Sequence, residues 1–453
     1  MAGRIRKLLV ANRGEIAVRI IRAAHELGME AVAIHSIADR DSLPVRLADE
    51  AVEIGPAHAT KSYLDVGAVL RAARETGADA VHPGYGFLAE NADFARGVEE
   101  AGLVFVGPTP ETIRIMGDKS LARETAQRAG VPVVPGSEGA VAGIDQAIAV
   151  AERIGFPLLV KASAGGGGRG IRVARDHAEL AREFPVAQAE ARAAFGDPGV
   201  YLERFIPRAR HVEVQVLGDG RDVVHLYERE CSLQRRRQKV LEEAPSPALA
   251  PGARERLCAS AVRLARAVSY RGAGTLEYLL DADTGEFLFI EMNTRIQVEH
   301  PITEMVTGVD LVRAMLRVAD GEPLPVRQDE VAVRGAAIEC RINAEDVDRG
   351  FMPSPGTISA DLALPGGPGV RVDTLLYPGY KVPPFYDSLL AKVVVWAESR
   401  DAALARMARA LRETRIQGVP TTVALHRRLL ARDEVRTGNY DTSSLERWVA
   451  TGA

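Results

Sequence analysis

Two glutamates that flank a predicted hairpin are the first candidates for chemistry. In GTLEYLLDADTGEFLFIEMNTRIQVEH, residues 274–300, two apolar runs surround a turn rich in Asp, Thr and Gly, which is typical of a β-hairpin. With Thr284 near the centre of the turn, Glu277 and Glu291 fall opposite each other on one face. Facing carboxylates repel each other unless a cation neutralises them, and Mg²⁺ prefers carboxylate oxygens together with substrate phosphates. The hairpin therefore predicts a divalent-cation site.

Polar residues continue at every second position beyond the hairpin. They are Glu291, Asn293, Arg295, Gln297 and Glu299, with Met292, Ile296 and Val298 between them. On an extended strand this period places all five polar groups on one face, over roughly 26 Å at about 3.3 Å per residue. A solvated edge strand has the same period, but it is usually built from Thr, Lys and Glu and not from metal-type and anion-type ligands. The pattern predicts a binding face.

A run of four glycines lies in KASAGGGGRGIRV, residues 161–173. It is not a Walker P-loop, because no Lys-Ser or Lys-Thr follows and β-like residues flank both sides. A glycine tip exposes backbone N–H groups that are able to cradle an anion, and Lys161 and Arg169 add charge. A plain surface turn has the same composition, so the run alone leaves both interpretations open.

A dense basic run, CSLQRRRQK at residues 231–239, precedes Glu242 and Glu243. A solvated or nucleic-acid-facing patch would carry similar charges, but here the charge balances locally and the whole chain has a net charge of -4. We therefore expect a small anionic ligand and no nucleic acid. HPGYGF (82–87) is a glycine-rich loop after a strand, a composition that on its own is more typical of a plain turn. His211 in RHVEVQV fits a ligand contact and a structural strand histidine equally well.

Strand-like and helix-like patterns alternate in the part of the chain that precedes these groups. Apolar runs at 7–11 and 31–35, and the stretches 78–87 and 102–109, predict strands with helices between them, such as 14–27. This order predicts an open parallel sheet with binding loops at the carboxyl ends of its strands. The first turn, ANRGE, lacks GxGxxG, so an NAD domain is not expected.

Later segments predict a second and a third unit. The Pro/Gly-rich stretch at 130–136 separates a helical pair around MGDK (116–119) from a compact α+β insert, expected to contain helices at 143–154 and 176–195 and strands on either side of the glycines. From about residue 206 strands dominate, and the tail carries an amphipathic helix at 401–414.

Length and composition fit a multidomain globular protein. The chain has 453 residues, too many for one core, of which 47% are hydrophobic and 26% charged. The three cysteines are far apart and form no CxxC or CxxH spacing, which favours a reducing cytosol over a disulfide or zinc scaffold. No apolar stretch approaches the roughly 18 residues that span a membrane, and the N-terminus has no signal-peptide pattern. A cytoplasmic location is expected.

Together these stretches resemble biotin carboxylase, an ATP-grasp ligase, over essentially the whole chain. The matching motifs are ANRGEIA (11–17), HPGYGFLAEN (82–91), MGDK (116–119), VKASAGGGGRG (160–170), RHVEVQV (210–216), CSLQRRRQK (231–239), EMNTRIQVEHP (291–301), ECRINAED (339–346) and YDSLLAK (386–392). The resemblance implies an α/β and α+β fold: a Rossmann-like pre-ATP-grasp domain at 1–117, an ATP-grasp domain at 118–334 with a mobile lid at about 133–205, and a biotin carboxylase C-terminal domain at 335–453.

The same resemblance implies ATP-dependent carboxylation of biotin with bicarbonate through carboxyphosphate, using Mg²⁺ or Mn²⁺. Carried over residue by residue, the ATP contacts are Lys119, Lys161, Gly165, Gly166, Gly167, Gly168, Glu203, Ile206, His211, Gln234 and Leu279. The metal ligands are Glu277, Glu291 and Asn293. The bicarbonate ligands are Lys239, Arg295, Gln297, the Val298 backbone and Glu299. Tyr85 and Arg341 border biotin, and the implied catalytic residues are Glu299, Arg295, Lys239 and Arg341.

The implied roles divide the chemistry among these groups. Glu299 is the base that deprotonates bicarbonate, Lys239 lies near the transferred phosphoryl group and Arg341 stabilises the biotin enolate. The glycine run becomes the tip of a lid that closes over the ATP phosphates and keeps carboxyphosphate from water. One residue departs from the expected pattern: Arg237 stands where relatives are expected to have a histidine near the ATP ribose.

The chain contains no Ala-Met-Lys-Met stretch, the biotin attachment signature, so we expect a free-standing carboxylase. The resemblance favours a subunit of acetyl-CoA carboxylase, acting in fatty-acid synthesis. Its partners would be a separate biotin carboxyl carrier protein and carboxyltransferase subunits, and the resemblance implies a homodimer. A subunit of pyruvate carboxylase or of another acyl-CoA carboxylase fits equally well. Two alternatives remain. One is another ATP-grasp ligase, which the motifs RIQVEH and ECRINAED argue against. The other is an inactive scaffold that binds the carrier protein, which the presence of Lys239, Arg295, Glu299 and both metal-type carboxylates argues against.

Overall fold

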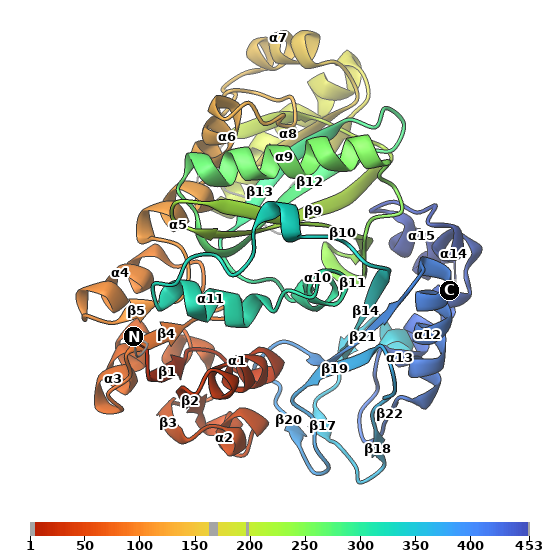
Figure 1. Cartoon of the computed structure of the whole chain (residues 1–453). Helices are drawn as coiled ribbons and strands as arrows, with labels where there is room; N and C mark the ends of the chain where they lie inside the picture. The colour runs from red at the N-terminus through yellow and green to blue at the C-terminus, as the bar shows by residue number, and fades with distance from the viewer. Residues whose placement is uncertain (1–4, 163–170, 196–198, 452–453) are drawn as a thin grey trace.

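The computed structural model describes residues 5–162, 171–195 and 199–451. The N-terminal part forms a parallel sheet, as the sequence predicts; it has five strands in the order β3-β2-β1-β4-β5, one more than the four predicted strands. Its strands are β1 Lys7–Val10, β2 Glu30–Ser36, β3 Glu50–Gly55, β4 Ala80–His82 and β5 Val104–Phe105. Its helices are α1 Gly14–Glu26, α2 Leu43–Leu47, α3 Val66–Glu75 and α4 Ala92–Glu100. This unit lies at the bottom of Figure 1, in red and orange.

The strand order of this sheet reverses between β1 and β4, so the loops that follow these two strands lie side by side. Asn12, after β1, donates from Nδ2 to the carbonyl oxygens of Pro83 at 2.6 Å and of Tyr85 at 2.7 Å, both after β4. A switch point of this kind opens a crevice at the carboxyl ends of the strands. The ANRGE and HPGYGF turns therefore form one edge of a binding site.

An eight-stranded antiparallel sheet forms the centre of the molecule, in the order β13-β12-β9-β10-β11-β14-β21-β19. Its strands are β9 Ala209–Asp219, β10 Val223–Arg235, β11 Gln238–Ala244, β12 Arg271–Asp281, β13 Phe287–Asn293, β14 Ala336–Asn343, β19 Val370–Thr374 and β21 Leu389–Ala397. Pairing of β11 with β14 carries this sheet across the predicted 334/335 boundary, so the second and third predicted units share one sheet (Figure 1).

Helices cover this sheet, and their apolar side chains pack with those of the strands to form the hydrophobic cores. The helices are α5 Pro110–Gly117, α6 Lys119–Arg128, α9 Pro251–Ala267, α10 His300–Thr307, α11 Leu311–Ala319, α12 Arg400–Glu413, α13 Val423–Ala431, α14 Asp433–Thr437 and α15 Ser444–Ala450. Short strand pairs complete the C-terminal part: β15 Glu345–Asp346 with β16 Met352–Pro353, β17 Gly356–Thr357 with β20 Lys381–Val382, and β18 Leu362–Ala363 with β22 Arg415–Ile416.

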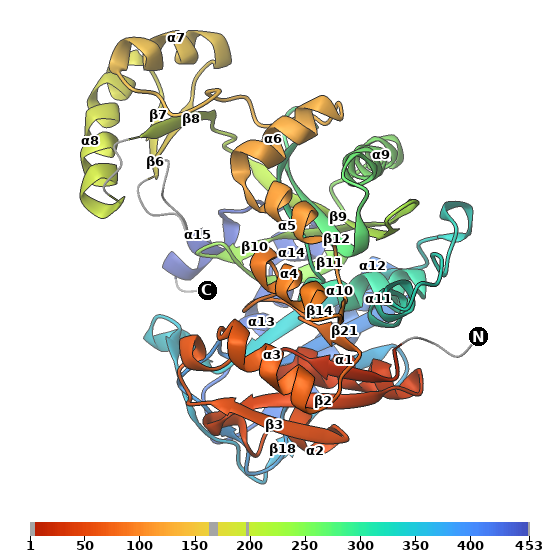
Figure 2. The ribbon, with the colours of Figure 1, turned by 90° about the vertical axis from the view of Figure 1, so that its left-hand side faces the viewer.

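The predicted α+β insert projects from the main body, at the upper left of Figure 2. It contains α7 Ile144–Ile154 and α8 His177–Phe195, which pack on a three-stranded antiparallel sheet of β6 Leu158–Ala162, β7 Ile171–Ala174 and β8 Val200–Arg204. The segment has its own small core, which includes Leu158, Val160 and Phe184. Gly165, Gly166, Gly167 and Gly168 lie outside the described residues, so their predicted ATP contacts stay predictions.

One sequence expectation about backbone shape is wrong. The chain is not extended from Glu291 to Glu299: β13 ends at Asn293, and a loop leads into α10, which begins at His300. β13 is the edge strand of the sheet, and on its outer side it is paired only through an isolated bridge between Phe289 and Val133. Pro301 in the first turn of α10 favours a helix start. Bending brings the polar side chains of this stretch into one cluster, where an extended strand would spread them in a row.

Candidate active site

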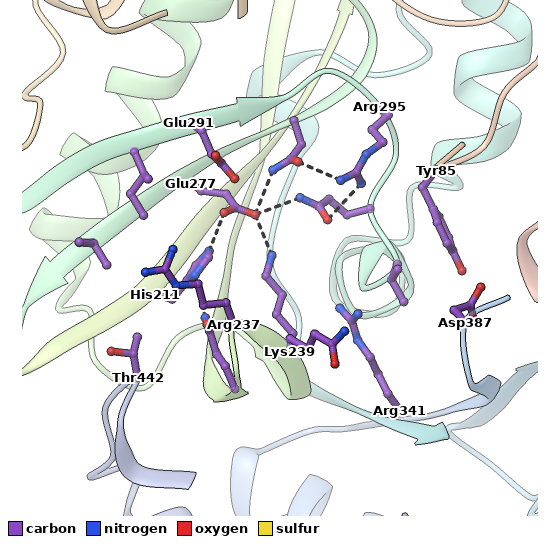
Figure 3. Close-up of a pocket in the computed structure, with 18 of the residues that line it drawn as sticks. Tyr85, His211, Arg237, Lys239, Glu277, Glu291, Arg295, Arg341, Asp387 and Thr442 are labelled. Atoms are coloured by element: carbon purple, nitrogen blue, oxygen red, sulfur yellow. Dashed lines mark hydrogen bonds and ion pairs between the residues drawn. The ribbon is translucent and has the colours of Figure 1, made fainter. Parts of the chain in front are cut away.

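A cavity of about 1300 Å³ lies between the N-terminal loops, the projecting segment, the large sheet and the C-terminal part. The predicted site residues that line it are Tyr85, Lys119, Lys161, Glu203, Ile206, His211, Gln234, Lys239, Glu277, Leu279, Glu291, Asn293, Arg295, Gln297, Val298 and Arg341. Glu299 lies directly behind its wall and is fully buried. Residues that are far apart in the sequence thus meet around one space (Figure 3).

The predicted carboxylate pair sits in the wall of this cavity. Glu277 on β12 and Glu291 on β13 are direct register partners, as the symmetric hairpin predicts, and the ladder shifts immediately after Glu277. Burial and the facing Glu277 raise the pKa of Glu291. The Glu291 side chain, which lines the cavity, has no hydrogen bond or ion pair to any described residue. Two facing carboxylates with Asn293 beside them fit the oxygen ligands of a divalent cation.

Glu277 is crowded by donors (Figure 3). Its Oε1 accepts from Lys239 at 2.9 Å, Asn293 at 3.0 Å and Gln297 at 3.2 Å, and its Oε2 lies 3.2 Å from His211 Nε2. Burial opposes ionisation of Glu277, but Lys239 and His211 outweigh it and hold its pKa below the ordinary value. Although burial also opposes the charged form of His211, the Glu277 charge raises the pKa of this histidine to about 9.

Lys239 joins three carboxylates. Its Nζ lies 2.9 Å from Glu277, 2.6 Å from Glu299 and 2.5 Å from Glu213. Burial disfavours the ammonium, but these carboxylates raise the pKa of Lys239 well above its ordinary value. The lysine is therefore a fixed positive charge in the middle of the cavity wall.

Glu299 lies between two cations. Its Oε1 accepts from Lys239, and its Oε2 accepts from Arg341 Nη2 at 2.9 Å. Burial and the Glu213 charge favour protonation, yet Lys239 and Arg341 hold the pKa of Glu299 below its ordinary value. Glu299 is thus an ionised carboxylate, able to accept a proton from an anion that lies beside Lys239.

The loop after β13 presents the remaining anion-type ligands. Arg295 donates to Glu90 at 2.8 Å and to Asn293 at 2.9 Å, and its Nη1 lies 3.4 Å from the Gln297 amide oxygen. The Val298 carbonyl accepts from Lys392 Nζ at 2.8 Å. These contacts fix a bent loop whose side chains face the cavity.

A second group of predicted residues gathers at the opposite end. Ile206 packs with Val134, Leu279 and Leu288 in a small apolar cluster that borders the cavity. In the projecting segment, Lys161 donates to Glu203. His211 pairs with Gln234 at 2.8 Å. An apolar wall with charged groups beside it suits a flat ring that carries phosphates.

The predicted biotin-side residues occupy the far side of Glu299. Tyr85 donates to Glu15, and burial raises its pKa well above the ordinary value. Arg341 is held by Glu242 at 2.5 Å as well as by Glu299. Phe87 and Tyr386 also line the cavity at this end.

Several residues of the site were missed by sequence reasoning. They are Glu213, Arg229, Glu242, Glu15, Glu90 and Lys392. Arg229, fully buried, donates to Glu213, Gln215 and Thr303 beneath the Lys239 cluster. A signal existed for Glu213, because it lies two residues after His211 and so shares its face of β9. Arg229 gave none, since a strand arginine is usually exposed.

Arg237 lies in the turn between β10 and β11, where Arg236 and Arg237 have φ of 48° and 65°. It lines the cavity near Thr442 (Figure 3) and pairs with no side chain that the structure describes. Its expected place near the ATP ribose stays a prediction.

Comparisons with known proteins agree with this geometry. The family profile "Biotin carboxylase, N-terminal domain" matches residues 4–113, "Carbamoyl-phosphate synthase L chain, ATP binding domain" matches 118–327, and "Biotin carboxylase C-terminal domain" matches 339–447. Biotin carboxylase 1 of Bacillus subtilis is 54% identical over 450 residues, covering 99% of this chain and 100% of the relative. Biotin carboxylase of Pseudomonas aeruginosa is 54% identical over 445 residues, covering 98% of each chain.

Solved structures show the same similarity. The biotin carboxylase domain dimer of Hydrogenobacter thermophilus 2-oxoglutarate carboxylase, in complex with MgADP, ADP and bicarbonate, has a TM-score of 0.90 and 48% identity over 98% of each chain. The β-γ-ATP complex of Campylobacter jejuni biotin carboxylase has a TM-score of 0.91 and 46% identity, over 98% of this chain and 99% of that one. The chain therefore belongs to the biotin carboxylase family.

Proposed function

We propose that this chain carboxylates biotin with bicarbonate and ATP, forming the C–N bond of carboxybiotin and releasing ADP and phosphate. The observation that carries this proposal is Glu299, a fully buried carboxylate held between Lys239 and Arg341 beside the Glu277–Glu291 pair. A buried carboxylate, two cations and a facing carboxylate pair thus surround one point, and this arrangement supports the proposal. Bicarbonate activation by phosphoryl transfer needs these groups and needs no covalent nucleophile from the protein.

The nucleotide occupies the end lined by Ile206, Leu279 and His211 in this proposal. The apolar wall takes the purine ring, and Lys119, Lys161 and His211 lie on the route of the phosphates. Glu203, which now neutralises Lys161, becomes a partner for polar groups of the nucleotide when the lysine turns to phosphate. Gln234 orients His211 through its ring nitrogen.

Glu277 and Glu291, with Asn293 beside them, would hold a divalent cation, which would supply positive charge for the ATP phosphates. The protein prepares the site by facing the two carboxylates across β12 and β13, and it leaves Glu291 without a described partner. The Hydrogenobacter thermophilus relative is in complex with MgADP, which supports Mg²⁺ as the cation.

Bicarbonate lies between Arg295, Gln297, the Val298 backbone and Lys239. Glu299 takes the bicarbonate proton as an oxygen of that anion attacks the γ-phosphorus of ATP, so that ADP leaves and carboxyphosphate forms. Lys239 neutralises charge on the transferred group, which is the main catalytic demand of phosphoryl transfer. The C–O bond between the carboxyl carbon and the phosphate then breaks, the departing phosphate takes the N–H proton of biotin, and the biotin nitrogen forms the new bond to the carboxyl carbon. Arg341 stabilises the negative charge that develops on biotin.

Biotin reaches the cavity past Tyr85 and Arg341, attached to a separate carrier protein. A carboxyltransferase then uses the carboxybiotin, and acetyl-CoA is the acceptor that we favour, in fatty-acid synthesis. Similarity to the biotin carboxylase subunit of pyruvate carboxylase, at 48% identity and a TM-score of 0.87, keeps pyruvate as the second candidate. Because acceptor choice belongs to the carboxyltransferase, the cavity is the same for both.

We also propose a homodimer and a cytoplasmic location. The dimer is supported by the Hydrogenobacter relative, which is a dimer. The location is supported by the use of ATP and by three buried, unbridged cysteines. No helix in the described part of the chain is long and apolar enough to cross a bilayer.

The experiment is ATP hydrolysis by the purified chain with bicarbonate present or absent, and with or without free biotin. We expect hydrolysis to depend on bicarbonate and to rise with biotin. Glu299→Gln should lower kcat by about 10²- to 10⁴-fold, the usual contribution of a general base, while the affinity for MgADP stays within twofold. A rate of ATP hydrolysis that does not rise when biotin is added would contradict the proposed reaction. Loss of MgADP binding in Glu299→Gln would contradict the role of this residue.

A further inference from the structure

Four sequence motifs that the reaction does not fully explain meet at one buried lysine. Lys392 comes from YDSLLAK, Glu15 from ANRGEIA, Tyr85 from HPGYGF and Val298 from the loop after β13. Lys392 Nζ lies 3.1 Å from Glu15 Oε1 and 2.8 Å from the Val298 carbonyl oxygen, and Glu15 accepts the Tyr85 hydroxyl. The Lys392 side chain is 0% exposed and does not line the cavity.

The strand register explains why this lysine points at the site. Lys392 on β21 is the register partner of Arg341 on β14 and of Asp373 on β19, so the three side chains stand in one row on one face of the sheet. Asp373 Oδ2 lies 3.8 Å from Lys392 Nζ and also binds Arg371. Burial disfavours the ammonium, but Glu15 and its acidic neighbours raise the pKa of Lys392, so it stays charged.

We infer that Lys392 is a positioning residue that sets the geometry of the bicarbonate loop and of the biotin-side tyrosine together. Since a peptide group is planar, the contact that holds the Val298 carbonyl also fixes the amide that leads into Glu299. A carbonyl turned towards Lys392 cannot also face an anion in the cavity, where its dipole would repel bicarbonate. Through Glu15, the same ammonium places the Tyr85 hydroxyl. This inference rests on the proposed function.

The two contacts of Lys392 predict different losses when they are removed separately. Glu15→Gln weakens the Tyr85 contact but leaves the Lys392–Val298 contact, so it should raise the KM for biotin and spare the KM for bicarbonate. Lys392→Met/Glu15→Gln removes both contacts without leaving an unpaired Glu15 charge, so it should raise both values. A displacement of about 1 Å at a reacting centre can cost roughly 10²-fold, and we expect an increase of at least about 10-fold in each KM.

Lys7→Met is the matched control. Lys7 also binds a backbone carbonyl, that of Thr76 at 3.1 Å, together with a glutamate, Glu50 at 3.3 Å, but it lies outside the cavity. The Lys7→Met substitution should leave the KM for bicarbonate and the KM for biotin unchanged. Calorimetric titration with MgADP should give wild-type affinity in every variant, because the nucleotide end does not touch Lys392. A lysine with a merely structural role would not produce this separation between substrates.

The outcomes separate the two ideas. If the wild-type protein shows no bicarbonate-dependent ATP hydrolysis, the proposed function fails. If it does, and the double variant binds MgADP but has the same KM for bicarbonate as Glu15→Gln, the positioning role of Lys392 is overturned. Should the double variant not fold, Lys392→Arg keeps the charge and displaces the donor, and an unchanged KM for bicarbonate in that variant overturns the role equally.

Discussion

Glu299, the proposed base, has a pKa below that of an ordinary glutamate and is therefore a weaker base. Lys239 and Arg341 hold its pKa below the ordinary value, and a lower pKa reduces the power of a general base. Bicarbonate bound beside Lys239 would share the N–H donors of this lysine and bring its own negative charge. Both effects raise the pKa of the carboxyl group. Glu299 therefore becomes a stronger base when its substrate is in place, which limits ATP hydrolysis in the absence of bicarbonate.

Glu242 is a buried carboxyl group on the other side of Arg341. Although Arg341 binds it, burial raises its pKa to about 7. Glu339, its direct register partner on β14, is also buried, and neither of its carboxylate oxygens has a hydrogen-bond partner among the described residues. Burial raises the pKa of Glu339 well above its ordinary value and so favours its neutral form. Arg341 is thus held by Glu242, whose carboxyl group ionises near neutral pH, and by Glu299.

The Glu242 pKa predicts a dependence of stability on pH. A raised folded-state pKa means that the folded protein binds a proton more tightly than the unfolded chain, so stability falls as the pH rises from about 4.5 to about 7. Glu242→Gln keeps an oxygen for Arg341 and removes this loss. Its free energy of unfolding, relative to wild type, should rise by on the order of 1–3 kcal/mol between pH 5 and pH 8. Urea unfolding at four pH values tests this, and a difference that does not change with pH would contradict it.

At the scale of elements, the sequence predicted structure best where neighbouring residues alone determine the pattern, as in a hairpin turn or a strand with a period of two. The hairpin of β12 and β13 and the opposition of Glu277 and Glu291 follow from a turn centre and a period of two, and the structure confirms both. The extended conformation expected up to Glu299 is wrong, because the end of an edge strand depends on tertiary neighbours. The Lys239 cluster shows the same limit. Its partners Glu213 and Glu299 come from β9 and from the start of α10, and no local pattern joins them.

The HPGYGF turn, which sequence alone left open, has a conformation that requires glycine. Gly84 has φ of +62°, and a Cβ at this position would lie 2.8 Å from Asn12 Nδ2, the group that bonds the Pro83 and Tyr85 carbonyls. Gly84→Ala should therefore displace both loops at the biotin side, raise the KM for biotin several-fold and cost about 1–2 kcal/mol of stability. Steady-state kinetics and urea unfolding test both effects.

Gly86→Ala is the control for Gly84→Ala. Gly86 has φ of +69°, but a Cβ there meets nothing within 4 Å. It should therefore cost about 1 kcal/mol through backbone strain alone and change the KM for biotin little. Equal effects of the two substitutions would mean that the Asn12 contact has no part in placing Tyr85.

At the scale of the whole molecule, one sheet connects units that the sequence divides. The β11–β14 pairing puts Lys239 on β11 and Arg341 on β14 in neighbouring strands, so the two cations on Glu299 come from opposite sides of the proposed 334/335 boundary. A hinge at this boundary would separate them. The projecting segment, in contrast, has its own core and sheet, and Figure 2 shows it apart from the main body. Motion that admits and encloses substrate is therefore expected in that segment and not at the seam.

Hydrogen exchange tests this division of the molecule. The seam strands β11 and β14 should open with the same free energy as β9 and β12, because all of them belong to one continuous ladder. The segment strands β6 and β8, which have a smaller core, should open at a free energy at least about 2 kcal/mol lower. MgADP should raise the protection of β6 and β8, since Lys161 and Glu203 line the cavity, and it should change β14 less. If β14, β21 and β19 instead exchange together before β9 and β12, the C-terminal part is a separate cooperative unit, and the geometry around Glu299 depends on its docking.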